Sequence, residues 1–317
     1  MDIVDRYGLT VAELSTEEAL DVAGPWRGPA VDLLRVVDPH PHDRAALTAA
    51  GFAVKPSWVN WVAPLRDSEA AFLGALGANE RRKVRRGLDL AASAGLSVRV
   101  RPELEEAPLE EFLGVYEAQV AGMRNGLNLA RAEQRTLLER SGSHIGVYAY
   151  EGGRMVGGCV CWVREKDSLL QLRYVATAAV DQRGALTRAL YMAAFQAGRE
   201  LGCTRMSLGN DTSLYGHVTS PGLYEFKKRL GFTPLPSGTV DPGAGGDEAD
   251  RFVSLRALTD PSLLLAYDAG SGTDGSRGST SLGLRVLASR EDVDVAPYRA
   301  DFLSGVTVTV IPEASPY

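Results

Sequence analysis

The chain has few of the residues from which metal sites and nucleophilic sites are built. It contains three cysteines and four histidines among 317 residues. Cys159 and Cys161 alternate on one face of an expected strand, so we expect buried free thiols and no disulfide. His40 and His42 form a His-Pro-His pair that could ligate a metal. No acidic or cysteine partner stands nearby at ligand spacing, which favours a surface loop, and we predict no metal site.

Long apolar runs and an excess of positive charge are also missing. No apolar stretch approaches the roughly 20 residues that cross a bilayer. Residues 1–5, MDIVD, lack the basic region and the apolar core of a signal peptide. The formal net charge is −6, so any contact with nucleic acid has to be local. These absences favour a cytoplasmic protein without a membrane partner, long enough for one large or two modest domains.

The most informative stretch is residues 221–232, PGLYEFKKRLGF. Pro221 marks the start of a helix and Gly231 its end. Three cations lie beside and opposite an apolar stripe with helical spacing, which consists of Leu223, Phe226 and Leu230. Before this helix we expect a long helix over 184–201 and a short strand over 206–211. Earlier still, residues 146–176 read as a three-strand meander that turns at Gly152-Gly153.

The order strand, helix, strand, helix, Gly-Phe, strand resembles the second half of the GNAT acyltransferase fold. Within it, Gly-Leu-Tyr-Glu-Phe-Lys-x-x-Leu-Gly over 222–231 is similar to Fem-type (FemABX-like) aminoacyl transferases and to the related Acetyltransf-6 group. Fem-type proteins carry amino acids from charged tRNA onto amines. The resemblance implies a mixed α/β (α+β) GNAT fold in a double GNAT-like arrangement, with a degenerate first lobe.

We predict three segments on this basis. Residues 1–66 end in helix, Gly-Phe, strand and resemble a degenerate GNAT-like lobe. Residues 67–258 form the GNAT acyltransferase domain, which opens with an amphipathic helix over 67–94. Residues 259–317 form a strand-rich extension. We expect this extension to pack against residues 1–66 and to complete the first lobe.

The start of the long helix departs from the acyl-CoA pattern. Acyl-CoA-dependent GNAT enzymes hold a diphosphate on Arg/Gln-x-x-Gly-x-Gly/Ala, where backbone N–H groups meet the phosphates. Here the stretch is Arg183-Gly184-Ala185-Leu186-Thr187-Arg188. Leu186 and Arg188 stand where small residues belong, so we predict weak or absent acetyl-CoA binding. Gln182, Arg183 and Gly184 still offer phosphate donors, although Gly184 is equally consistent with a plain helix start.

A second basic feature lies in the helix over 67–94, where residues 81–86 contain five cations in six positions. Arg81 and Arg85 share a face, as do Arg82 and Arg86. This is either a solvated basic face or a surface whose guanidinium groups bind phosphates. The Fem-type resemblance implies the second interpretation. The predicted donor-binding residues are Arg81, Arg82, Arg85, Arg86, Gln182, Arg183, Gly184 and Arg188.

Lys227 is the predicted centre of the chemistry. It stands four residues before Gly231, where many acyl-CoA enzymes have a tyrosine and Fem-type proteins have a lysine. A fixed ammonium stabilises an ester-derived oxyanion and a leaving alkoxide better than a phenol does. The alternative is a solvated helix lysine. Asp211 and His217 are candidates to accept the proton of the attacking amine. The remaining assignments are Tyr224 to catalysis, and Tyr174, Asn210 and Tyr215 to substrate binding.

The implied function is amide formation, in which an aminoacyl group moves from aminoacyl-tRNA to the amine of a small molecule or peptide intermediate in specialised biosynthesis. No cofactor is expected to be bound permanently. The chain is short and lacks the long helical hairpin of cell-wall Fem enzymes, which favours a small amine acceptor over a peptidoglycan precursor. Two alternatives remain open, an acyl-CoA-dependent N-acyltransferase and a catalytically silent GNAT-like binding protein.

Overall fold

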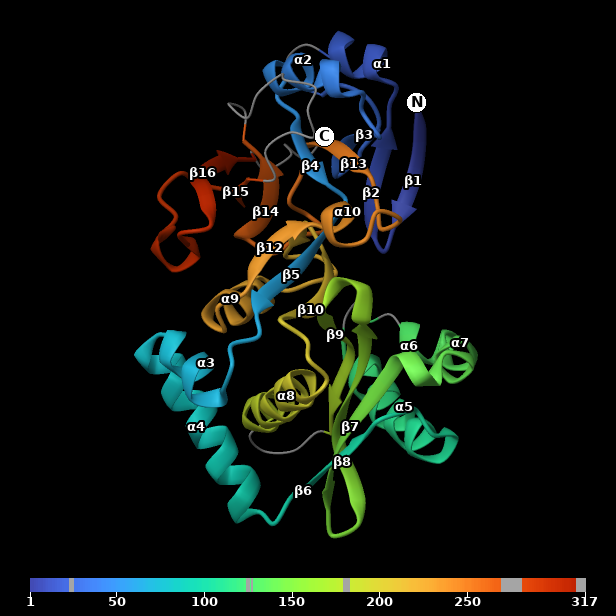
Figure 1. The fold of residues 1–317 in the computed structure, drawn as a ribbon. Coiled ribbons are helices and arrows are strands. Elements are labelled where there is room, and N and C mark those ends of the chain that lie inside the picture. Colours follow the sequence, from blue (N-terminus) through green and yellow to red (C-terminus); the bar gives the residue numbers. More distant parts are fainter. Residues whose placement is uncertain (23–25, 124–125, 127, 179–182, 269–280, 312–317) are drawn as a thin grey trace. The chain divides into compact units, whose positions relative to one another are not determined.

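The computed structural model describes residues 1–22, 26–123, 126, 128–178, 183–268 and 281–311. The chain forms two compact units (Figure 1). The first consists of Met1–Asn60, Asn210–Lys228 and Thr233–Tyr317, and the second of Trp61–Gly209 and Arg229–Phe232. Neither unit is one continuous stretch of sequence. The boundaries predicted near residues 66 and 258 divide the chain into GNAT-like segments, which are a different kind of unit. Those boundaries remain a prediction.

A five-stranded sheet forms one layer of the first unit, in the order β1-β2-β3-β13-β4. Strands β1 and β2 form an antiparallel hairpin, β2 and β3 run parallel, and β13 runs antiparallel to both of its neighbours. Helices α1 and α2 pack on one face, where Ala19 and Leu47 are fully buried with Leu34. The elements are β1 (Asp2–Arg6), β2 (Leu9–Glu13), α1 (Thr16–Asp21), β3 (Leu33–Val37), α2 (Arg44–Ala49), β4 (Ala53–Pro56) and β13 (Asp247–Phe252).

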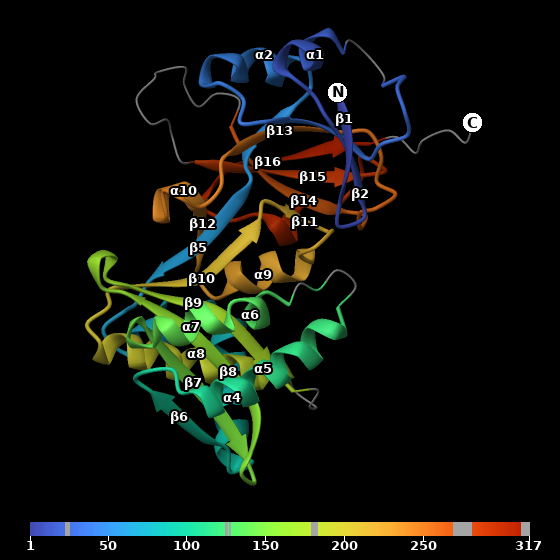
Figure 2. The ribbon, with the colours of Figure 1, turned by 90° about the vertical axis from the view of Figure 1, so that its right-hand side faces the viewer.

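A four-stranded sheet, in the order β11-β14-β15-β16, forms a second layer of this unit (Figure 2). Leu264 and Leu287 of this sheet share one core with Val11 and Leu33. This is the contact predicted between the two terminal segments; the GNAT-like character of the lobe stays a prediction. The remaining elements of the unit are β11 (Leu214–Tyr215), α9 (Pro221–Arg229), β12 (Thr233–Pro236), α10 (Ser237–Val240), β14 (Ser262–Tyr267), β15 (Leu282–Ala288) and β16 (Leu303–Val310).

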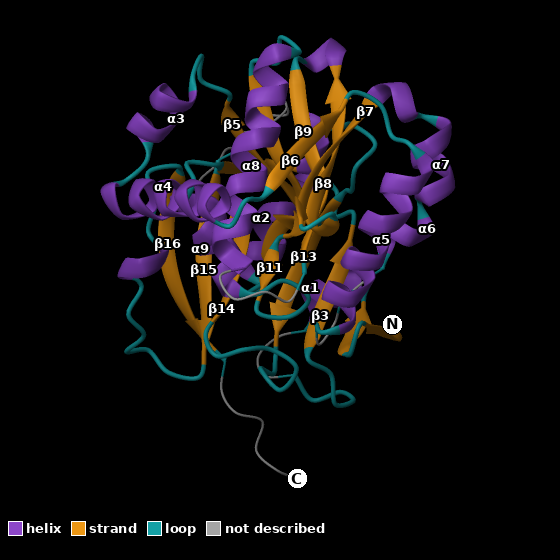
Figure 3. Ribbon diagram, turned by 90° about the horizontal axis from the view of Figure 1, so that it is seen from below, coloured by secondary structure: helices purple, strands orange, loops and turns teal. Residues whose placement is uncertain are grey.

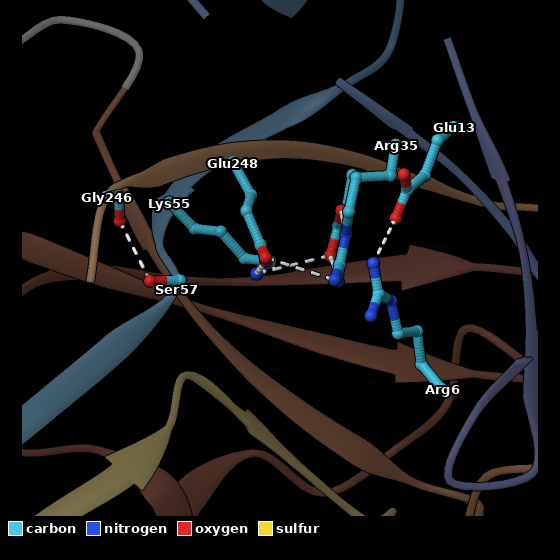
Figure 4. A network of polar contacts seen from close by, with 8 residues as sticks. Arg6, Glu13, Arg35, Lys55, Ser57, Gly246 and Glu248 are labelled. Atoms are coloured by element: carbon cyan, nitrogen blue, oxygen red, sulfur yellow. Dashed lines mark hydrogen bonds and ion pairs between the residues drawn. The ribbon is translucent and has the colours of Figure 1, made fainter. Parts of the chain in front are cut away.

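The five-stranded sheet also carries a buried cluster of charges, which Figure 4 shows from close by. The strand register places Asp250 opposite Arg35 and Glu248 opposite Lys55. Arg35 donates from Nε and Nη2 to the two Asp250 carboxylate oxygens, at 2.7 Å each, and Lys55 forms ion pairs with both acids. Burial alone raises the pKa of Asp250, but Arg35 and Lys55 outweigh it and hold that pKa below its usual value.

The second unit is built on a sheet whose strands follow the order β10-β9-β8-β7-β6 and continue into β5. Helix α8 covers one face, and α5, α6 and α7 cover the other (Figure 1). Strands β9 and β10 run parallel, joined by α8 as a crossover helix. The elements are β5 (Trp58–Pro64), α3 (Glu69–Ala75), α4 (Ala78–Ser93), β6 (Ser97–Arg101), α5 (Glu106–Ala121), α6 (Leu129–Ala132), α7 (Gln134–Glu139), β7 (His144–Glu151), β8 (Arg154–Arg164), β9 (Leu169–Thr177), α8 (Arg183–Glu200) and β10 (Arg205–Thr212).

Much of the predicted element order is confirmed. The mixed α/β class is present, the meander turns at Gly152 and Gly153 with positive φ, and β9, α8, β10, α9 and β12 follow as expected. The continuous helix predicted over 67–94 is wrong. The segment forms two helices, α3 and α4. The backbone of Leu76 between them is extended and its side chain is buried, and Gly77 is the N-cap residue of α4. In the part of the chain that the structure describes, no helix is both long and apolar enough to cross a membrane.

The charge cluster generates a stability prediction. The substitution Asp250→Asn leaves the buried cations Arg35 and Lys55 with Glu248 as their acidic partner in this cluster. We therefore expect the free energy of unfolding to fall by about 3–5 kcal/mol near pH 7. Because the folded-state pKa of Asp250 is lowered, its contribution is present above pH about 4 and is lost as the pH falls through that lowered pKa. Urea unfolding over a pH series measures both effects.

The matched control is Glu139→Gln, which removes the exposed pair with Arg135 on α7 and should cost at most about 1 kcal/mol. Equal losses for Asp250→Asn and Glu139→Gln would contradict the account of the buried cluster.

Candidate active site

Lys227 lies on the buried face of α9. Its exposed fraction is 3%. Its Nζ atom lies 2.8 Å from each carboxylate oxygen of Asp211. The interpretation of Lys227 as a solvated helix lysine is therefore wrong.

Asp211, at the end of β10, is held from a second direction. Tyr215 on β11 is fully buried, and its hydroxyl donates to Oδ2 of Asp211 at 2.9 Å. The ring of Tyr215 packs edge-on against Tyr224, with 5.7 Å between the centroids. The Tyr224 hydroxyl donates to the backbone carbonyl of Tyr298 at 2.9 Å. Four predicted site residues, Lys227, Asp211, Tyr215 and Tyr224, thus form one cluster within the first unit.

Burial sets the electrostatics of this cluster. It lowers the pKa of Lys227, and the neighbouring Asp211 carboxylate opposes that shift. Burial likewise raises the pKa of Tyr224 above its usual value. A buried ion pair costs desolvation free energy and contributes little net stability. Groups with a perturbed pKa gather at functional sites, which makes Lys227 and its neighbours a candidate active site.

His217 occupies a different environment from the cluster. Its Nδ1 lies 3.2 Å from the carbonyl oxygen of Ala257, and its Nε2 lies 3.3 Å from that of Arg6. Both ring nitrogens thus face backbone carbonyls from distant parts of the first unit. This arrangement fits a residue that anchors the loop before α9, and the structure does not bring its ring nitrogens to the Lys227–Asp211 pair.

The other two predicted substrate-binding residues also have structural partners. The Asn210 side-chain oxygen accepts hydrogen bonds from Asn60 at 2.6 Å and from Ser237 at 3.2 Å. Tyr174 lies in the core of the second unit, edge-on to Tyr116 with 5.6 Å between centroids, and burial raises its pKa to about 12. A contact of Asn210 and Tyr174 with substrate remains a prediction.

The predicted donor-binding residues fall on two helices of the second unit. On α4, Arg82, Arg85 and Arg86 are exposed and Arg81 is half-buried. On α8, Arg188 already donates to Glu80 at 2.7 Å and to the carbonyl of Gly184 at 2.9 Å. These contacts tie α8 to α4 and to its own first turn, so α4 offers the more accessible cations.

Two further predicted donor residues have no side-chain description. Gln182 lies outside the described residues, and Arg183 is placed as the first residue of α8 without its side chain. Leu186, which replaces a small residue of the acyl-CoA pattern, is 7% exposed and packs inward. Among the described residues, no group of three or more His, Cys, Asp and Glu side chains is arranged to hold a metal ion.

Comparison with known proteins gives similar solved structures. No family model and no curated protein matches the chain. FemX is 14% identical, with a TM-score of 0.44 over 70% of this chain and 72% of FemX. L-PGS from Bacillus licheniformis is 13% identical, with a TM-score of 0.41 over 69% and 68%. A tandem GNAT protein from the clavulanic acid biosynthesis pathway is 12% identical, with a TM-score of 0.39 over 69% and 64%.

The buried pair predicts an asymmetric effect of mutation on stability. Asp211→Asn leaves the Lys227 ammonium buried without its carboxylate, so the free energy of unfolding should fall by about 3–5 kcal/mol. Adding Lys227→Met removes the stranded charge and should restore most of that loss. Urea unfolding of wild type, Asp211→Asn, Lys227→Met and the double variant measures this coupling. Strictly additive effects of the two substitutions would contradict the ion pair.

Proposed function

We propose that this chain is an acyltransferase that forms an amide, moving an aminoacyl group from aminoacyl-tRNA to the amine of a small molecule or peptide intermediate. The observation that carries the proposal is the environment of Lys227. This residue occupies the lysine position of the Phe-Lys-x-x-Leu-Gly sequence, and it is buried in an ion pair with Asp211. A lysine kept at this depth with a carboxylate partner is costly for folding alone.

The chemistry requires charge stabilisation at two moments. The amine nitrogen attacks the ester carbonyl, a C–N bond forms, and negative charge develops on the carbonyl oxygen. The C–O bond to the ribose then breaks, the amine nitrogen gives up a proton, and the departing alkoxide gains one. A preorganised ammonium in a low-dielectric environment stabilises both oxyanions. We assign this role to Lys227, whose Nζ can also supply the proton to the alkoxide.

Asp211 has two roles in this proposal. Its carboxylate lies 2.8 Å from the Lys227 ammonium and opposes the loss of charge that burial favours. It also fixes the direction of the ammonium, because the Tyr215 hydroxyl holds the carboxylate from the other side. The Lys227–Asp211 pair accepts the proton that the attacking amine loses, and it gives a proton to the departing alkoxide. The protonation state of the pair is therefore the same at the end of the cycle as at the start.

The donor is polyanionic, and α4 offers cations to it. Arg82, Arg85 and Arg86 are exposed on this helix. Guanidinium groups recognise phosphate oxygens with paired N–H donors. With a formal net charge of −6, the chain needs such a local cationic surface to attract tRNA. The engagement of Arg188 by Glu80 supports α4 as the main phosphate contact.

Turnover should depend on Lys227 far more than on its neighbour. Lys227→Met removes the oxyanion donor, so we expect kcat to fall by roughly 100-fold or more. Donor affinity should change little, because the interaction strengthens only as charge develops. The matched control is Lys228→Met, whose ammonium bonds to the backbone carbonyls of Pro297 and Arg299. Amide product from aminoacyl-tRNA and a panel of amines is the readout, and full turnover in Lys227→Met would overturn the mechanism.

The arginines of α4 should affect binding and its salt dependence. Replacing Arg82 and Arg86 by Ala should weaken aminoacyl-tRNA binding and reduce the slope of log affinity against log salt by about 1.4–1.8, the value for two lost phosphate contacts. Filter binding at several salt concentrations measures the slope. Arg135→Ala is the control, since this arginine is exposed on α7 of the same unit. An unchanged slope in the Arg82, Arg86 variant would assign these residues to a solvated helix face.

A further inference from the structure

Helices α4 and α8 of the second unit cross with their backbones in close contact (Figure 3). A Cβ atom on Gly87 would lie 2.8 Å from the carbonyl oxygen of Ala185, so only glycine allows this approach. On one side of the crossing, Glu80 accepts a hydrogen bond from Nε of Arg188 at 2.7 Å. Glu80 is 4% exposed. The crossing point and this buried pair fix the separation of the two helices.

On the other side of the crossing the helices line a cavity of about 260 Å³ that is open to solvent on one side. Its walls come from the end of α4, the start of α8 and the sheet. Most of the lining is apolar, and it includes Leu90, Ala94, Leu96, Val156 and Leu186. An apolar cavity of about 150 Å³ is large enough to bind benzene. The present cavity therefore accommodates an aliphatic or aromatic group of roughly six to eight non-hydrogen atoms.

Ser93 and Glu151 are the polar residues in the described part of this cavity's lining. The Ser93 hydroxyl donates to the carbonyl of Leu90 at 3.1 Å, so its hydrogen is already used within α4. Among the lining residues that the structure describes, Glu151, at the end of β7, is the one with a charged side chain. Within the described part of the chain, its carboxylate forms no hydrogen bond or ion pair. A ligand whose apolar part enters the cavity thus presents its polar end to a carboxylate.

We propose that this cavity binds an amphipathic amine, with the ammonium group on Glu151 and the apolar part against Leu90, Leu96 and Leu186. This site goes beyond the proposed function and does not rest on it, because the binding needs neither Lys227 nor a tRNA donor. The apolar contacts contribute in proportion to the area removed from water. The charge-assisted hydrogen bond to Glu151 supplies the preference for an amine.

The test compares three ligands with the same six-carbon chain on the whole protein. Hexylamine, hexanol and hexanoate are titrated by isothermal calorimetry at low ionic strength. We expect hexylamine to bind most tightly, hexanol about tenfold more weakly, and hexanoate most weakly. The exposed arginines of α4 would attract an anion, so tighter binding of hexanoate than of hexylamine would overturn the proposal. Failure of all three ligands to bind would also overturn it.

Variants locate the binding. Glu151→Gln should weaken hexylamine binding about tenfold and leave hexanol binding unchanged, while Glu139→Gln on α7 should leave both unchanged. Ala94→Leu narrows the cavity and should weaken hexylamine and hexanol alike. Circular dichroism confirms that each variant is folded. Unchanged hexylamine affinity in Glu151→Gln would contradict the assignment of Glu151, and unchanged affinity in Ala94→Leu would place the binding elsewhere.

Discussion

The account depends on one interaction, the burial of the Lys227 ammonium against the Asp211 carboxylate. Removing both charges from water is costly, and their attraction offsets that cost only when the geometry is good. Here Nζ lies 2.8 Å from both carboxylate oxygens, and Tyr215 occupies a further acceptor position on Asp211. The pair joins α9 to the end of β10, and Tyr215 adds β11 to the same cluster. The position of α9 is thus set by polar contacts as well as by packing.

Burial also lets the ammonium of this pair stabilise negative charge more strongly than an exposed lysine does. An exposed ion pair stabilises a nearby anion weakly, because water screens it. A buried ammonium interacts with developing negative charge in a medium of lower dielectric, where the interaction is stronger. Burial lowers the pKa of Lys227, so its proton is released more readily than that of an ordinary lysine. In the function proposed for this chain, Lys227 supplies the two properties that ester aminolysis requires, a positive charge and a transferable proton.

Local sequence signals predicted the parts of the fold that local physics decides. The Gly152-Gly153 hairpin follows from the freedom of glycine to adopt positive φ, and the order of β9, α8, β10 and α9 follows from periodicity. Periodicity did not identify which residues of α9 are buried. Helical spacing emphasised Leu223, Phe226 and Leu230. Leu230, just after α9, is fully buried, but within α9 the buried residues are Tyr224 and Lys227. Lys227 is buried because of Asp211, which belongs to another element.

Partners far apart in the sequence explain what was missed. Arg35 and Asp250 are 215 positions apart, and strand register alone brings them together. The break between α3 and α4 and the cavity beside Gly87 depend in the same way on tertiary packing. A single sequence contains no signal for such pairings.

The claim that the Lys227–Asp211 pair serves transfer from an ester donor is tested most directly by the choice of acyl donor. The purified protein is incubated with one amine acceptor and either aminoacyl-tRNA or acetyl-CoA, and the amide product is quantified by mass spectrometry. The account predicts amide formation from aminoacyl-tRNA and none from acetyl-CoA. Amide formation from acetyl-CoA alone would contradict it.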